Sequence, residues 1–89
     1  PDAVYTLELL VKPTGIPSPT ILHYQELGLI ARIAPSGRGV SRFSDEAFRA
    51  LRRIEHLRIR YGMNLHGLKL TLKLLDEVER LRDHLRSRQ

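Results

Sequence analysis

The stretch Pro17-Ser-Pro-Thr-Ile-Leu-His-Tyr-Gln-Glu-Leu-Gly-Leu-Ile30 has the composition of a short helix with a defined start and end. Ser18 is suited to the N-cap, Pro19 to the first turn, and Gly28 to the position just after the last turn. The stretch therefore predicts a helix from about Pro19 to Leu27.

The predicted helix has one buried side and one exposed side. Ile21 and Tyr24 are expected in the core, whereas Leu22 and His23 are expected at the surface. His23, together with Thr20, is a candidate polar contact to DNA, whereas an exposed leucine suits an apolar contact with a protein. The exposed side is thus a candidate functional surface for either kind of partner.

A second short helix is predicted before this one. Thr6 is expected to cap it, and it should run from Leu7 to about Lys12, because Pro13 disfavours helical geometry in the residue before it. Gly15 supplies the turn. Two short helices joined by a glycine-containing turn are typical of a helix-turn-helix.

Residues 31–43 lack helical periodicity and are predicted to form a wing. Ile33 on one side, and Val40 with Arg42-Phe43 on the other, can form two short strands joined by the glycine-rich turn Pro35-Ser-Gly-Arg-Gly39. Three arginines would then lie at the tip of this ribbon and on its flanks: Arg38, Arg32 and Arg42. Such a ribbon is suited to contact DNA phosphates or to enter the minor groove.

A third helix is expected to follow the wing. Ser44 should cap it, and the two acidic residues after Ser44 suit the positive end of the helix dipole. Gly62 should end it. Five apolar residues at helical spacing predict its buried stripe: Phe48, Leu51, Ile54, Leu57 and Tyr61.

A fourth helix, capped by Asn64, is predicted from Leu65 to about Arg86. Apolar residues spaced by four, three and four positions form a coiled-coil seam of about two heptads in its later part: Leu74, Val78, Leu81 and Leu85. A lone helix of this length is marginal, so the seam needs a partner or must fold back. We therefore expect a winged domain of residues 1–73 and a C-terminal helical extension of residues 74–89 that forms a homodimer.

The composition is that of one small globular domain. Of the 89 residues, 42% are apolar and 28% are charged, and no apolar run approaches the roughly 18 residues of a membrane span. The N-terminal segment has no basic region followed by an apolar block, so it does not resemble a signal peptide. The absence of cysteine excludes disulfides and thiol chemistry. These features favour a cytoplasmic protein without a membrane partner.

Positive charge is concentrated in the middle of the chain. Residues 29–60 hold eight arginines against three acidic residues, a local charge of +5 that equals the net charge of the whole chain. Such a segment suits a polyanion, because bound counterions are released when phosphates are neutralised. The alternative is a merely solubilising surface.

The sequence gives no indication of catalysis, a metal or a cofactor. Its four histidines have no metal-ligand spacing on a shared helix face. The sequence also shows no cluster of a candidate nucleophile with a candidate general base. We therefore expect neither an enzyme nor a bound cofactor.

With this order of elements in place, the sequence resembles the MerR superfamily over essentially the whole chain. The segments that carry the resemblance are Tyr5-Thr6, Thr14-Gly-Ile16, Thr20-Ile21 with Tyr24, Glu26-Leu-Gly-Leu-Ile30, Arg42-Phe-Ser44 and Leu51-Arg-Arg-Ile54. The resemblance implies a mainly α, winged helix-turn-helix fold with a two-stranded wing and a C-terminal helix able to start a coiled coil.

Two branches of the superfamily are similar at the start of the fourth helix. Asn64-Leu-His-Gly67 resembles the Asn-Leu-Ala-Gly of HspR-type repressors, which control heat-shock genes through DNA. The same segment, continued by residues 74–81, also resembles the chaperone modulators of the CbpM family, which bind the J-domain of a DnaJ-like co-chaperone.

The leading hypothesis is an HspR-like transcription regulator that binds double-stranded DNA. Its expected DNA contacts lie on the second helix, the wing and the third helix: Pro19, Thr20, His23, Arg32, Arg38, Arg42, Arg52 and Arg53. The alternative is a CbpM-like chaperone modulator, because Leu22 stands where DNA-binding relatives usually carry an arginine and cannot neutralise a phosphate. Its expected protein-binding residues are Leu22, His23 and Glu26.

Overall fold

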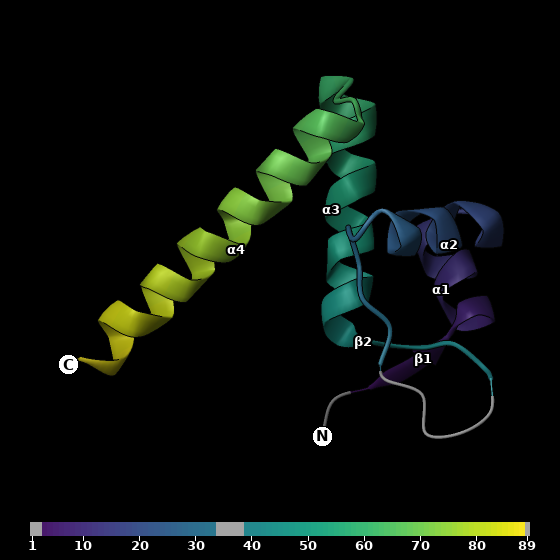
Figure 1. Ribbon diagram of the computed structural model, residues 1–89, viewed down its shortest axis with the longest axis horizontal. Coiled ribbons are helices and arrows are strands. Elements are labelled where there is room, and N and C mark those ends of the chain that lie inside the picture. Colours follow the sequence, from purple (N-terminus) through teal and green to yellow (C-terminus); the bar gives the residue numbers. More distant parts are fainter. Residues whose placement is uncertain (1–2, 34–38, 89) are drawn as a thin grey trace.

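The computed structural model describes residues 3–33 and 39–88. Within these residues the elements in chain order are β1 (Val4–Thr6), α1 (Leu7–Thr14), α2 (Ser18–Glu26), β2 (Arg42–Ser44), α3 (Asp45–Tyr61) and α4 (Leu65–Ser87). Figure 1 shows α1 and α2 on one side of α3, whereas α4 extends away from α3 on the other side. In the described part of the chain, no helix is both long enough and apolar enough to cross a bilayer.

The first helix runs two residues further than predicted, through Pro13 to Thr14. A proline in the last turn removes one backbone donor, but two other bonds close that turn. The Thr14 hydroxyl donates to the Leu10 carbonyl (2.6 Å), and the N–H of Gly15 donates to the Val11 carbonyl (2.8 Å). Gly15 reaches this position with a φ of 71°, which glycine adopts without strain.

The start of α2 differs from the prediction by one residue. Pro17, not Ser18, is the N-cap, and the Ser18 side chain makes no capping bond. The extended Pro17 turns its carbonyl oxygen towards the helix, where it accepts the N–H groups of Thr20 (3.0 Å) and Ile21 (3.1 Å). These two bonds close the first turn without a side-chain cap.

The expected mainly helical fold with a two-stranded antiparallel sheet is confirmed, but the strand partners differ from the prediction. β2 pairs with β1, with Tyr5 opposite Phe43, because Asp45 at the start of α3 holds the N-terminal segment. Its carboxylate accepts the Tyr5 hydroxyl (2.7 Å) and the N–H of Ala3 (3.3 Å).

The base of the wing is joined by a backbone bond from the N–H of Ile33 to the carbonyl of Arg42 (2.8 Å). Ile33 itself is not part of a strand. The predicted wing tip at residues 34–38, including Arg38, lies outside the described residues.

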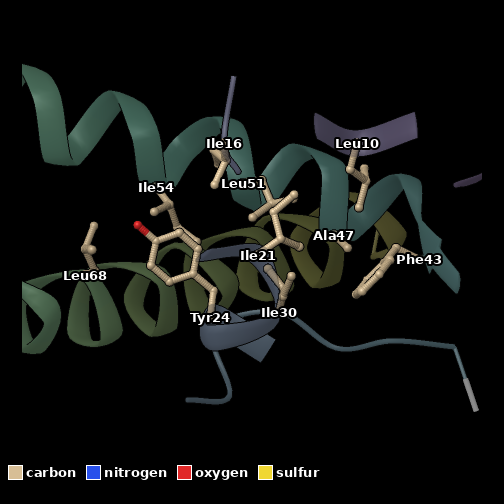
Figure 2. Packing of buried hydrophobic residues seen from close by; sticks show 10 residues of the cluster. All are labelled: Leu10, Ile16, Ile21, Tyr24, Ile30, Phe43, Ala47, Leu51, Ile54 and Leu68. Atoms are coloured by element: carbon tan, nitrogen blue, oxygen red, sulfur yellow. The ribbon is translucent and has the colours of Figure 1, made fainter. Parts of the chain in front are cut away.

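The core lies where α1, α2 and the first half of α3 meet, with β2 and the start of α4 at its edges. Among the described residues, ten apolar side chains are buried in it: Leu10, Ile16, Ile21, Tyr24, Ile30, Phe43, Ala47, Leu51, Ile54 and Leu68 (Figure 2). The prediction that Ile21 and Tyr24 belong to the core is confirmed.

The buried stripe of α3 is shorter than predicted. Leu51 and Ile54 are buried, and Phe48 and Leu57 are partly buried, but Tyr61 is 69% exposed. Ile54 is the last α3 residue in the core, and Tyr61 lies about two turns beyond it, past the region where other helices pack. The helical spacing of Tyr61 was therefore misleading.

The prediction that Asn64 caps α4 is confirmed, because its side-chain oxygen accepts the N–H of Gly67 (2.9 Å). α4 meets the core through Leu68 and Leu72 near its start. The helix then runs without interruption past residue 73, and every described residue after Leu75 is exposed. The division into residues 1–73 and 74–89 stays a prediction.

Candidate nucleic-acid interface

The turn between α1 and α2 fixes the orientation of α2. Ile16 in this turn is only 1% exposed, and its N–H donates to the hydroxyl of Thr14 (3.2 Å). From the sequence, Ile16 contributed only to the family resemblance and was not assigned to the core, although an apolar residue between a glycine and a proline in a short turn is a candidate anchor. The buried Ile16 thus anchors the turn before α2 in the core.

α2 carries three of the eight predicted DNA contacts and all three predicted protein-binding residues. Pro19, His23 and Glu26 are exposed, and Thr20 is partly buried. Leu22 is partly buried rather than fully exposed, which corrects the prediction for this residue. It lies at the border of the two faces, because it follows the buried Ile21 by only about 100° around the helix.

Two wing arginines in the described segments are exposed, Arg32 and Arg42. Within those segments neither residue takes part in an ion pair. Alternation along β2 turns Arg42 away from the core, because its neighbour Phe43 is completely buried. Arg42 is therefore available to an external anion.

The two α3 arginines expected to contact DNA do not share the α2 side of the molecule. Leu51 and Ile54 turn one face of α3 into the core, so the residues between them point outward. Arg52 stacks beside Phe48, with its guanidinium carbon 5.8 Å from the ring centroid. Arg53 instead pairs with Glu79 of α4 at 2.6 Å.

The Arg53–Glu79 pair joins two helices at positions 26 residues apart. The hydrogen bond and the charge of Arg53 hold the pKa of the Glu79 carboxyl below its usual value. Both side chains remain about half exposed, so the pair orients α4 more than it stabilises the fold.

A groove of about 400 Å³ lies between the segment 28–33, α3 and α4. Arg32 lines it together with Arg53, and acidic residues of α3 and α4 line it as well. The structure thus brings Arg32 and Arg53 to a common groove of mixed charge, whereas Arg42 does not line it.

The predicted seam of α4 faces solvent. The exposed fractions of its four residues are 55%, 49%, 48% and 63%, in the order Leu74, Val78, Leu81 and Leu85. The four residues of the seam are thus accessible to a second chain.

Comparison with known proteins gives three findings. Residues 5–88 match the family model of MerR HTH family regulatory proteins. A protein of Streptomyces coelicolor that carries the name heat shock protein HspR is 31% identical over 78 residues, which are 88% of this chain and 51% of that protein. The chain therefore spans about half the length of this curated relative.

The third finding concerns the fold. The crystal structure of HiNmlR, a MerR family regulator that lacks the sensor domain and is bound to promoter DNA, matches with a TM-score of 0.70 at 22% identity. The match covers 96% of this chain and 67% of that one. The family match confirms the predicted superfamily, and the match to the solved structure confirms the predicted fold. The matched family is one of regulators and not of enzymes. The chain belongs to the MerR family of helix-turn-helix regulatory proteins.

Proposed function

We propose that the protein is a DNA-binding transcription regulator of the HspR-like type, with α2 as its recognition helix. The observation that carries the proposal is the outer face of α2, where Pro19 and His23 are exposed on a helix that the buried Ile16 and Ile21 hold in place. A helix presented in this way fits the major groove of B-DNA, where its N-terminal residues meet base edges. Thr20 is the third contact that we assign to this helix.

The wing supplies the phosphate contacts in this proposal. Arg42 and Arg32 are exposed, and Arg38 follows in the sequence of the wing. Arginine is well suited to phosphate because its planar guanidinium can make two parallel hydrogen bonds. We leave Arg52 and Arg53 outside the main DNA surface, since their contacts are with Phe48 and with α4.

The test begins with binding to double-stranded DNA selected from a random pool of duplexes. The protein should bind the selected duplex far more tightly than non-specific duplexes, and His23→Ala should weaken specific binding by about fivefold or more. Leu9→Ala, at an exposed leucine of α1, is the matched control and should have no effect. The proposal is wrong if no duplex binds more tightly than about 10⁻⁴ M near physiological salt, since even non-specific binders reach that range.

We further propose that the exposed seam of α4 forms a homodimer. The seam provides about two heptads of apolar contacts, which suit a coiled coil with a second copy. Sedimentation should show a dimer that Leu81→Lys converts to a monomer, because a charge would enter the seam. Leu9→Lys adds the same charge at another exposed leucine and should leave the dimer intact. Equal effects of both changes would argue against this seam.

A CbpM-like chaperone modulator is the second candidate, and the leucine at position 22 favours it. The face formed by Leu22, His23 and Glu26 would then cover a J-domain. The partial burial of Leu22 leaves less apolar surface for this contact than a fully exposed leucine would offer. Binding of a purified J-domain that Leu22→Arg abolishes would support this candidate, whereas absence of binding to the unmodified protein would exclude it.

A further inference from the structure

One face of α3 is exposed to solvent, and Arg49 at its border also lines the groove between the segment 28–33, α3 and α4. Leu51 and Ile54 face the core, Arg53 faces α4, and Phe48 stacks on Tyr5 of β1 with ring centroids 5.3 Å apart. The remaining face carries five exposed residues at helical spacing, Arg49, Arg52, His56, Ile59 and Arg60. We call these five residues the outer α3 face.

The outer α3 face is positively charged, and its three arginines form no ion pair with the residues that the structure describes. Arg53 and Arg58 of the same helix form ion pairs with Glu79 and Glu55, but Arg49, Arg52 and Arg60 form none with any residue that the structure describes. The carboxylate of Asp45, at the start of this helix, is already bonded to Tyr5 and to the backbone of Ala3, as described above.

Apolar and aromatic groups lie within the charged face and at its end. Ile59 is 65% exposed, and Tyr61, which follows at the end of the helix, is 69% exposed. The Tyr61 ring meets the ring of His56 edge-on, with centroids 5.8 Å apart. Arginine and tyrosine beside an exposed aliphatic residue are the composition of a protein-binding hot spot, whereas a phosphate backbone offers no apolar contact for Ile59.

We propose that the outer α3 face is a docking surface for an acidic, amphipathic helix of a partner protein. From Arg49 to Arg60 the face extends over twelve residues, or about 17 Å along the helix. A partner helix with carboxylates at a matching spacing can pair with the arginines while its apolar residues cover Ile59 and Tyr61. Charge complementarity of this kind gives orientation and specificity.

The position of the surface allows it to act together with α2. Ile21 and Tyr24 of α2 lie in the core with Leu51 and Ile54, so α2 is on the side of α3 opposite the outer α3 face. A partner docked on α3 would leave the exposed residues of α2 uncovered. The docking surface does not depend on the DNA-binding proposal.

The probe is a synthetic helical peptide with glutamates spaced by four, three and four positions and leucines between them. A peptide of the same composition in scrambled order is the control for net charge. Fluorescence anisotropy should show that the protein binds the patterned peptide and binds the scrambled one at least about tenfold more weakly. Equal binding of the two peptides would overturn the proposal, because the spacing would then be irrelevant.

Two variants with the same loss of charge locate the binding site. Arg49→Gln with Arg60→Gln should weaken binding of the patterned peptide by about tenfold, as expected for two lost surface charge pairs. Arg82→Gln with Arg88→Gln removes two exposed arginines of the C-terminal part of the chain and should change binding less than about twofold. Equal losses in both variants would overturn the proposal. Thermal unfolding of each variant verifies that the fold is unchanged.

A competition experiment separates a protein partner from a polyanion. A short random-sequence DNA duplex is added to the protein with the patterned peptide bound. The peptide should remain bound when the duplex occupies another surface. A contrary result is that the duplex displaces the peptide from the unmodified protein but not from the Arg49→Gln, Arg60→Gln variant. The outer α3 face would then be a polyanion site, and the assignment to a protein partner would be overturned.

Discussion

Replacing Arg42 with glutamine removes one exposed positive charge from the proposed DNA surface and leaves the backbone of β2 in place. In the described residues Arg42 forms no ion pair, so its loss leaves no internal carboxylate unpaired. The change should therefore affect DNA binding without lowering the stability of the fold.

The magnitude follows from the number of phosphates that the wing can neutralise. Three arginines, Arg32, Arg38 and Arg42, contribute a slope of log affinity against log salt of about −2.7, at about −0.9 for each phosphate contact. Between about 50 mM and about 200 mM salt, the affinity of one protomer should then fall about 40-fold. In the Arg42→Gln variant the slope should be about −1.8, and over the same salt range the affinity should fall about 12-fold. A dimer on two half-sites doubles both slopes.

The assay is fluorescence anisotropy of a labelled duplex over a series of salt concentrations. The matched control is Arg80→Gln, since Arg80 is an exposed arginine of α4 that already pairs with Glu77. The control should keep the slope of the unmodified protein. If Arg80→Gln lowers the slope as much as Arg42→Gln, binding responds to net charge and the wing has no special role.

Three further predictions concern the fold that positions α2. Leu51→Ala should lower the free energy of unfolding by about 2–5 kcal/mol, because Leu51 is completely buried, and a urea titration measures the loss; a loss below about 1 kcal/mol would contradict its place in the core. Asn64→Ala should cost about 1 kcal/mol in the same titration, whereas Ser44→Ala should cost clearly less, because Asn64 makes its capping bond and Ser44 makes none. The hydroxyl of Tyr5 lowers the pKa of Asp45, so the bond stabilises the fold above the ordinary pKa of an aspartate and is lost as the pH falls through the lower folded-state pKa. Tyr5→Phe should therefore reduce the acid-induced fall of the melting temperature, and parallel curves for the two proteins would contradict this role.

Local sequence signals predicted most of the helical framework. Asn64 and Gly62 were assigned correctly because capping and left-handed termination depend on residues only a few positions apart. The α2 start was displaced by one residue, because Ser18 is the residue that side-chain capping favours, whereas the first turn is closed by the backbone carbonyl of Pro17. Local reasoning thus locates elements well and their first residues less well.

The features that sequence reasoning missed depend on distant parts of the chain. The pairing of β1 with β2 joins residues about 40 positions apart and is fixed by Asp45, whose role as a partner of Tyr5 has no local signature. Arg53 was expected near DNA, but its orientation depends on Glu79 in another helix. Charge counts show that a segment is basic, but they do not show which arginines share one surface.

Chemical interference on a selected duplex tests the central claim, that α2 binds in the major groove, most directly. Dimethyl sulfate methylates N7 of guanine in the major groove and N3 of adenine in the minor groove. We expect methylation of guanines within the half-site to block binding, and we expect His23→Ala to remove that effect at one base pair. Binding that tolerates every methylated guanine N7, or an interference pattern that His23→Ala leaves unchanged, would contradict the assignment of α2 as the recognition helix.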